Sequence, residues 1–133
     1  MALVPVELTR VMLVETSDQQ VVVLEEKGGG RSFPIVIGIF EAVAIHRQLR
    51  GEPIPRPMTH DLLVSVIEGM GGKLEKIVVN DLRDGTFYGQ LHIRRGEDLY
   101  VIDSRPSDAI ACAVRVNCPI MVDERVFEKL EGE

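Results

Sequence analysis

Residues 33–62 constrain the fold more than any other stretch, because four structural signals follow one another there. Residues 33–37 are a short β-branched apolar run closed by Gly38, which is typical of a buried strand. A helical pattern follows over residues 39–50, and three prolines occur within residues 51–57. A second helix is expected to begin near Thr59. This order predicts a strand and two helices joined by a stiff turn.

Apolar residues occupy most of the circumference of the helix expected over residues 39–50. We therefore expect this helix to be buried on more than one side. Glu41 lies at the edge of the apolar arc, and His46 points roughly 140° away from it. The two side chains do not share a face and could not easily ligate one metal ion together. We interpret His46 as a hydrogen-bonded histidine near the core.

The segment GEPIPRP, residues 51–57, is expected to be a rigid strap, because each proline fixes its own φ and restricts the residue before it. Such a strap could hold Arg56 in place at a site, or it could be a stiff surface loop. Thr59 is expected to cap the following helix, with His60 and Asp61 in its first turn. Capping alone would explain Thr59 and Asp61.

Composition limits the possible functions. The chain has 133 residues and is expected to form one domain over residues 1–133, with a core from about 5 to 127 and an acidic C-terminal tail. With 45% hydrophobic residues and no Trp, the core must be largely aliphatic. A net charge of −6 argues against a general nucleic-acid coat protein, because phosphate binding depends on Lys and Arg. Any contact with nucleic acid is therefore expected to be local or assisted by a metal.

Cysteine usage and the absence of targeting signals indicate a compartment. Cys112 and Cys118 lack zinc-site spacing and a CxxC arrangement, and residues near the N-terminus lack a signal-peptide pattern. We expect a cytoplasmic protein with reduced thiols. The sequence has no apolar run of the roughly 20 residues needed to cross a bilayer, so no membrane association is expected.

The remaining patterns predict an α+β fold. Alternation over residues 4–14 indicates a long strand with one strongly buried face, which forms an N-terminal hairpin with residues 21–27 through a polar turn at residues 17–20. Strands at 73–82, 86–95 and 98–103 form an antiparallel meander, and residues 118–122 form a last short strand. Three to four helices are expected to pack on this largely antiparallel sheet. The run of glycines at 28–30 is interpreted as a turn, because no GK[ST] follows it.

The second helix is expected to bury one apolar stripe. The stripe contains these five residues: Leu62, Leu63, Val66, Ile67 and Met70. In the strand over residues 86–95, Phe87, Leu91 and Ile93 are expected to face the core. Tyr88, His92 and Arg94 would then line the opposite, polar face.

Residues 102–115 combine a strand end with a helix start. Asp103, Arg105 and Asp108 cluster there, with Pro106 expected in the first turn of the helix. Capping explains these residue types at little cost. The alternative is functional: backbone N–H groups and a guanidinium could receive an anion, and two carboxylates could hold a divalent cation that bridges a phosphate.

Three blocks carry a family resemblance: IGIFEAVAI at 37–45, PRPMTHDL at 55–62 and DSRPSDAIA at 103–111, with FYGQL at 87–91 between the last two. In this order and spacing the sequence resembles the bifunctional nuclease domain family of small bacterial and plant proteins, over roughly residues 5–127. Cys112 departs from the aliphatic residue expected at its position. The resemblance implies an α+β fold, a homodimer, and an activity that cuts both DNA and RNA.

A nuclease site can be assembled from the chemistry of these blocks. Asp103, Asp108 and Glu41 are candidates for binding Mg²⁺ or Mn²⁺ or for acting as a base, with His60 as general acid or base and Asp61 beside it. Arg56 and Arg105 are candidates for binding the phosphate. A site that reads phosphates would not discriminate between DNA and RNA.

A non-catalytic interpretation stays open at this point. The charged residues could serve as caps and ion pairs of a dimeric binding or regulatory module that recognises a small anion or a protein partner. The acidic balance, the absence of aromatic stacking platforms and the lack of a tight metal motif favour this alternative. Arginines converging on one concave surface would favour the nuclease, and arginines scattered into separate salt bridges would favour the module. The five in question are Arg47, Arg50, Arg56, Arg105 and Arg115.

Overall fold

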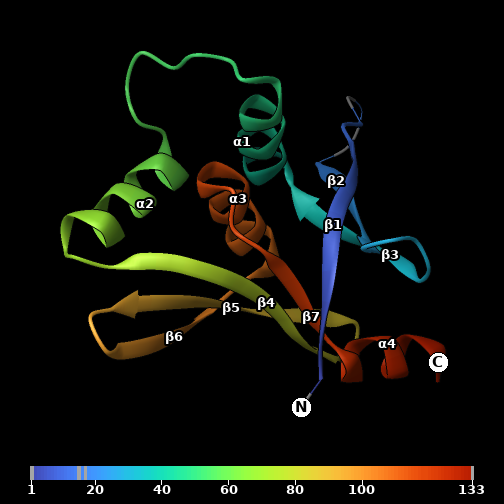
Figure 1. The fold of residues 1–133 in the computed structure, drawn as a ribbon. Helices are drawn as coiled ribbons and strands as arrows, with labels where there is room; N and C mark the ends of the chain where they lie inside the picture. Colours follow the sequence, from blue (N-terminus) through green and yellow to red (C-terminus); the bar gives the residue numbers. More distant parts are fainter. Residues whose placement is uncertain (1, 15, 17, 133) are drawn as a thin grey trace.

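The computed structural model describes residues 2–14, 16 and 18–132. Within them the chain forms a mixed sheet and helices on it, which confirms the predicted α+β class (Figure 1). The elements in chain order are β1 (Leu3–Met12), β2 (Gln19–Glu26), β3 (Ser32–Gly38), α1 (Ile39–Arg50), α2 (Thr59–Gly69), β4 (Lys73–Arg83), β5 (Thr86–Arg95), β6 (Asp98–Ser104), α3 (Pro106–Val116), β7 (Ile120–Asp123) and α4 (Glu124–Glu131).

The seven strands form one sheet in the order β3-β2-β1-β7-β4-β5-β6. The predicted N-terminal hairpin and the later meander are both present, on opposite sides of β7. β7 pairs antiparallel with β1 and parallel with β4. A four-residue strand from the end of the chain therefore joins the two halves of the sheet.

The N-terminal hairpin differs in detail from its prediction. Val6 is buried, but Met12 and Val14 are 39% and 42% exposed, so the strong burial expected along residues 4–14 is limited to the first half. The pairing of β1 with β2 shifts register between Leu8 and Arg10. This irregularity interrupts the alternation on which the prediction depended. Gln19 and Gln20, expected in a turn, begin β2, whereas Glu15 and Ser17 lie outside the described residues.

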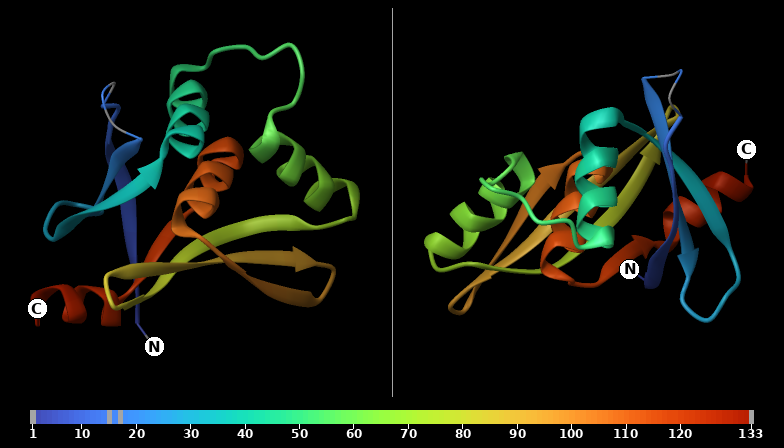
Figure 2. Two further views of the ribbon diagram at one scale, coloured as in Figure 1. Left: turned by 180° about the vertical axis from the view of Figure 1, so that it is seen from behind. Right: turned by 90° about the horizontal axis from the view of Figure 1, so that it is seen from above.

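Helix α3 lies at the centre of the helical layer and contacts α1, α2, β4 and β5 (Figures 1 and 2). Residues 109–113 are each at most 3% exposed, and four of the five are Ala or Cys. Small side chains allow neighbouring helices to approach closely. The aliphatic residue expected in place of Cys112 is unnecessary for packing, because Cys112 is fully buried.

Helix α1 is less buried than its composition predicted. Ala42 and Ile45 have no exposed surface, but Leu49 is 57% exposed and Phe40 is 82% exposed. The expectation of burial on more than one side was therefore wrong, because α1 lies at the margin of the helical layer and contacts α3 on one side. His46 is half-buried, and the predicted hydrogen bond of its ring is not found among the described residues.

Helix α2 is rotated relative to the prediction. Val64 is 2% exposed, whereas Leu62, Val66 and Met70 are 56%, 47% and 65% exposed. The buried row includes His60, which lies one turn before Val64 and contacts Asp108 of α3. Most of the predicted stripe is therefore exposed and only Ile67 is half-buried, because the helix turns its histidine inward.

Helix α4 is a packed element of the domain. Val126 and Phe127 are buried, and the Phe127 ring lies edge to face with Phe33 at 5.4 Å. Lys129 Nζ donates to Asp81 Oδ1 at 2.7 Å and to the Leu82 carbonyl at 3.0 Å. We call Asp81, Arg83 and Lys129 the α4 clamp. Hydrogen bonds from Lys129 and Arg83 hold the pKa of the Asp81 carboxyl well below its usual range.

None of the helices in the described residues is long and apolar enough to span a bilayer.

Candidate functional site

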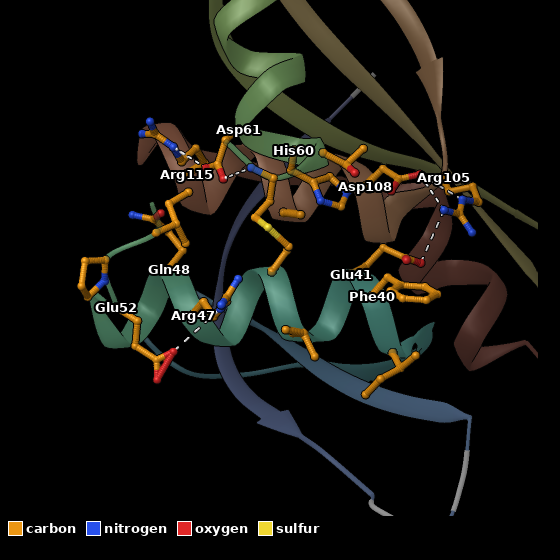
Figure 3. Close-up of a pocket in the computed structure, with 18 residues that line it drawn as sticks. Phe40, Glu41, Arg47, Gln48, Glu52, His60, Asp61, Arg105, Asp108 and Arg115 are labelled. Carbon is orange, nitrogen blue, oxygen red and sulfur yellow. Dashed lines mark hydrogen bonds and ion pairs between the residues drawn. The ribbon is translucent and has the colours of Figure 1, made fainter. Parts of the chain in front are cut away.

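A cavity of about 720 Å³ opens between α1, the start of α2 and one side of α3 (Figure 3). The proline-containing segment that joins α1 to α2 contributes Glu52, Pro53, Ile54 and Met58 to its wall. Its volume is within the range of sites that bind small molecules or parts of polymers. The three sequence blocks that carry the family resemblance contribute six of the polar residues that line the cavity: Glu41, Thr59, His60, Asp61, Arg105 and Asp108.

His60 and Asp108 form the first contact of the site. His60 is the second residue of α2 and Asp108 is the third residue of α3, so two helix starts meet here. His60 Nε2 lies 2.9 Å from Asp108 Oδ1, and the His60 side chain is only 12% exposed. When the imidazole is neutral, a carboxylate on Nε2 selects the tautomer that carries its proton there. Nδ1 is then the basic nitrogen of the ring.

Arg105 extends this contact to a second carboxylate. It is the N-cap residue of α3, and its Nε donates to Asp108 Oδ2 at 3.0 Å. Its Nη2 lies 2.9 Å from Asp108 Oδ2 and 3.4 Å from Glu41 Oε1. The hydrogen bond to Asp108, with the nearby charge of Glu41, raises the pKa of the guanidinium. We call His60, Asp108, Arg105 and Glu41 the site network.

Glu41 is the buried member of the site network. Its side chain is 8% exposed, whereas the Arg105 side chain is 68% exposed. Glu41 lies in the first turn of α1, where a carboxylate is stabilised by the positive end of the helix dipole. A Cβ on Gly38 would lie 3.0 Å from Glu41 Oε1, so the glycine that ends β3 leaves room for the carboxylate. Glu41 is therefore fixed by its backbone position and by one cation.

Asp61 faces another part of the same cavity. Its Oδ2 accepts the Met58 backbone N–H at 2.9 Å, and its Oδ1 accepts Arg115 Nε at 2.8 Å. Met58, not Thr59, is the N-cap residue of α2, so the predicted cap was one residue out. The first bond is the capping role that the sequence suggested for Asp61. The second links the start of α2 to the end of α3.

Two predicted site residues lie apart from this cavity. Arg56 is exposed in the strap, and the described part of the chain gives it no ion pair. Asp103 is exposed on β6, where it pairs with Gln90 of β5. Neither residue lines the cavity. Thus the structure brings together five of the seven predicted residues, namely Glu41, His60, Asp61, Arg105 and Asp108.

The predicted metal ligands do not form an open ligand set. Arg105 Nη2 lies between Glu41 and Asp108, so a guanidinium occupies the position between the two carboxylates. Asp103, the third predicted ligand, is on β6. Over residues 2–14, 16 and 18–132 no group of three or more His, Cys, Asp or Glu residues is arranged to hold a metal ion. The side chains as they stand do not fit a divalent cation at this place.

The positions of the arginines do not fully separate the nuclease from the non-catalytic module. Arg47, Arg105 and Arg115 converge on the cavity, as the nuclease interpretation requires. Each also forms an ion pair: Arg115 pairs with Asp61, and Arg47 lies 4.0 Å from Glu52. Phosphate binding would therefore use guanidinium groups that are already positioned by carboxylates.

The candidate site residues chosen from the sequence omit Phe40 and Arg115, although Arg115 is among the arginines whose convergence was expected to favour the nuclease. Arg115 lies seven residues after Asp108, a spacing that places both on one face of a helix, so the pattern could have identified it. Phe40 lies at the cavity beside Glu41 and is 82% exposed. No sequence signal distinguishes it from the other apolar residues of α1, because its exposure depends on where α1 packs.

Comparison with known proteins shows what this chain is similar to. The sequence matches the model of the bifunctional nuclease domain over residues 22–132, which includes every residue of the site network. An uncharacterised protein of Mycobacterium tuberculosis is 39% identical over 122 residues, which cover 92% of this chain and 73% of that protein.

Two plant proteins are more distant relatives. Bifunctional nuclease 1 of Oryza sativa subsp. japonica is 26% identical over 118 residues, which cover 86% of this chain and 36% of the plant protein. Bifunctional nuclease 2 of Arabidopsis thaliana is 26% identical over 107 residues, which cover 78% of this chain and 32% of the plant protein. The chain therefore spans about a third of the length of these plant relatives.

Proposed function

Because the chain belongs to the bifunctional nuclease domain family, we propose that it hydrolyses phosphodiester bonds of DNA and RNA at the cavity that holds the site network. One observation carries the proposal: the contact of His60 with Asp108, which lies beside the exposed guanidinium of Arg105. A carboxylate, an imidazole and a guanidinium are a sufficient set for activating water and binding a phosphate.

In this proposal His60 is the general base. Asp108 orients the ring through Nε2 and stabilises the imidazolium that forms when Nδ1 takes a proton from water. Water then attacks the phosphorus, and the bond from phosphorus to the leaving oxygen breaks. The imidazolium can return its proton to that oxygen. The small exposed fraction of the His60 side chain supports a defined ring position for both transfers.

Arg105 is proposed to bind the phosphate that is attacked. Its side chain is 68% exposed although two carboxylates contact it, so N–H groups are available to a ligand at the cavity. A guanidinium fits the oxygens of a phosphate and stabilises the additional negative charge of the transition state. Contacts to phosphate carry no information about base or sugar, which supports activity on both DNA and RNA.

The predicted Mg²⁺ or Mn²⁺ remains a separate hypothesis. A divalent cation supplies Lewis-acid stabilisation of phosphoryl oxygens in many nucleases. Here it would compete with Arg105 for Glu41 and Asp108. The steps proposed for His60 and Arg105 use only side chains of this chain, and cleavage measured with Mg²⁺, Mn²⁺ or EDTA tests the cation directly.

Phe40 supports a preference for unpaired strands. An aromatic side chain that is 82% exposed beside a nuclease site offers a face on which a base can stack. Bases of a duplex are already stacked on one another, so single strands gain more from this contact. We expect Phe40→Ala to weaken cleavage of single-stranded DNA and RNA by about tenfold or more. Cleavage of duplex DNA is expected to change less.

The decisive experiment measures cleavage of labelled single- and double-stranded DNA and RNA by highly purified protein. His60→Ala and Asp108→Asn are compared with Glu68→Gln, which removes an exposed carboxylate of α2, and with Asp103→Asn on β6. We expect cleavage by the wild type, Glu68→Gln and Asp103→Asn, and a loss in the two variants of the site network. Equal cleavage by all five proteins would indicate a contaminating nuclease and would contradict the proposal.

A second function is favoured by the apolar wall of the cavity. Ile39, Val43, Ile54 and Met58 line it, and the arginines there are already paired. A non-catalytic dimeric module could bind a small anion with an apolar part in such a cavity. Absence of cleavage under every condition, together with saturable binding of small phosphorylated or carboxylated compounds that Arg105→Ala abolishes, would favour this function.

The cytoplasmic location, the reduced thiols and the homodimer remain predictions. Cys112 and Cys118 are free cysteines, which agrees with a reducing compartment. A fractionation experiment tests the location, and a measurement of molar mass tests the dimer.

A further inference from the structure

The two edge strands of the sheet differ in how they are protected. β3 alternates buried and exposed residues and contains Pro34, which has no backbone N–H and discourages a further strand. β6 has four consecutive apolar residues that are all exposed: Leu99 at 44%, Tyr100 at 45%, Val101 at 48% and Ile102 at 46%. β6 contains neither Pro nor Lys, and its pairing with β5 has no bulge. Its charged residues, Asp98 and Asp103, lie near its two ends, and the apolar run between them has no feature that prevents a further strand from pairing.

The backbone of β6 has hydrogen-bonding groups that point away from β5. The β5–β6 hairpin has a two-residue turn, Gly96 and Glu97, between the paired residues Arg95 and Asp98. In such a hairpin the residues that flank the turn exchange hydrogen bonds, and every second pair along the strands does the same. The uninterrupted register therefore directs the N–H and C=O groups of Leu99, Val101 and Asp103 outward.

We propose that this edge pairs with β6 of a second copy of the chain, antiparallel and centred on Val101. β6 spans Asp98–Ser104, so Val101 is its midpoint and this register pairs the whole strand. The outward backbone N–H and C=O groups of Leu99 then form hydrogen bonds with those of Asp103 in the other copy. The backbone groups of Val101 pair in the same way with those of Val101 in the other copy. A register centred on Tyr100 would instead place Asp103 opposite Glu97 and pair a shorter segment, and like charges directly opposite are unfavourable.

Side chains on both faces of β6 suit this pairing. Tyr100 and Ile102 lie beside Ile93 and Leu91 of β5, so they are on the core side of the sheet. In the proposed register Tyr100 of each copy lies opposite Ile102 of the other. An aromatic residue opposite a β-branched residue is a favourable cross-strand pair. The dimer would therefore extend the apolar side of the sheet across its symmetry axis.

A strand pair of this length buries little surface, so the interface needs additional area to approach the roughly 1,200 Å² of a stable dimer. Helix α2 can provide it. Gly72, between the end of α2 and the start of β4, lies beside β5, the strand that pairs with β6, since a Cβ there would lie 3.0 Å from Ile93 Cγ2. Leu62 and Val66 of α2, and Met70 directly after it, are exposed and apolar.

This inference does not depend on nuclease activity. It does bear on the site, because β6 ends at Ser104 and Arg105 follows directly as the cap of α3. Pairing of β6 would fix the strand that precedes Arg105. The dimer and the catalytic proposal can fail separately, since the tests below measure molar mass and cross-linking only.

The test compares the molar mass of the wild type, Val101→Lys and Val36→Lys by light scattering at micromolar concentrations. Val36 is a matched control, because it is 59% exposed on β3, the other edge strand. We expect the wild type and Val36→Lys to have twice the mass of the chain. Val101→Lys should have the mass of one chain, because two lysines would lie opposite each other. A monomeric wild type, or a dimeric Val101→Lys, would overturn the proposal.

A second variant tests the register without removing apolar surface. Hydrogen-bonded residues of an antiparallel pair have Cα atoms about 5.5 Å apart, a separation that a disulfide can span. We expect Val101→Cys to form a disulfide-linked dimer under mild oxidation. The wild type should not, because Cys112 is buried and Cys118 is partly buried. A dimeric wild type whose Val101→Cys variant stays uncross-linked would exclude this register.

Discussion

The site network and the α4 clamp are both built from carboxylates and cations, yet they differ in what surrounds them. In the α4 clamp, Asp81 is 4% exposed and accepts hydrogen bonds from Lys129, from Arg83 and from a backbone N–H. All partners of this carboxylate therefore belong to the fold itself. In the site network, Arg105 is largely exposed and His60 lies on a cavity wall. An ion-pair cluster is therefore not by itself evidence of a site. A titratable ring and an exposed cation on a cavity are the informative features.

The same substitution in each cluster gives the largest contrast. We expect Asp108→Asn to lower cleavage by about 10²–10⁴-fold, because His60 loses the carboxylate that orients it. Asp81→Asn should instead destabilise the fold by about 2 kcal/mol, because Lys129 and Arg83 lose their buried partner. Cleavage rates and denaturant melts of both variants measure this. A stability loss in Asp108→Asn as large as that in Asp81→Asn would make the site network a structural cluster too.

The contribution of the α4 clamp to the free energy of unfolding should depend on pH. Lys129 and Arg83 depress the pKa of Asp81, so their contribution is present above about pH 4 and is lost as the pH falls through the depressed value. We expect Lys129→Met to lower the free energy of unfolding by about 1 kcal/mol at neutral pH, since Lys129 is 43% exposed. The gap to the wild type should narrow in acid. A gap that stays constant between neutral pH and about pH 2 would contradict this explanation.

Replacing an arginine by lysine in the site network or in the α4 clamp is expected to give a smaller difference in cleavage rate. Arg105→Lys keeps the charge but loses the fork that contacts Asp108 through two nitrogens, so cleavage should fall by roughly tenfold. Arg83→Lys is the matched control in the α4 clamp, and its cleavage should equal that of the wild type. Initial rates at saturating substrate provide the comparison. An equal loss of activity in both variants would contradict a role of the Arg105 guanidinium in binding the phosphate.

The smallest effect is expected at the thiols near the site network. Burial raises the pKa of Cys112 to about 12 and that of Cys118 to about 11. Because the thiolate is the reactive form, alkylation at about pH 8 should be slow in the folded protein and fast in denaturant. Mass spectrometry of timed samples measures this. Rapid labelling of Cys112 in the folded protein would mean that the base of α3 opens frequently.

Local patterns predicted most elements of the fold because they depend on neighbouring residues. The meander was identified from its two tight turns, and the start of α3 from Pro106 in its first turn. The rotation of α2 was not predictable in this way. Its sequence has an apolar stripe, but a contact between His60 and a residue 48 positions away decides which face turns inward.

The site was partly predictable for the same reason. Arg105 and Asp108 lie within one helical turn, so their proximity follows from the chain itself. Asp103 is only two residues before Arg105, but it belongs to β6 and lies apart from the cavity. Glu41 reaches the site because α1 packs on α3, a contact between distant segments. The sequence indicated which residue types could form the site, whereas tertiary packing determined which of the candidate residues lie together at the cavity.

The position of β7 has a consequence for how the protein is made. Residues 120–123 join the two halves of the sheet, yet they follow the other six strands in the sequence and leave the ribosome after them. Until β7 has been synthesised, the N-terminal hairpin and the meander are not joined in one sheet. The edges of β1 and β4 that later pair with β7 are unpaired during this time. Pairing of such distant segments is slow because the loop between them must close first. We expect the closure of the sheet by β7 to be a late step of folding, and the stage at which newly made chains most need protection from aggregation.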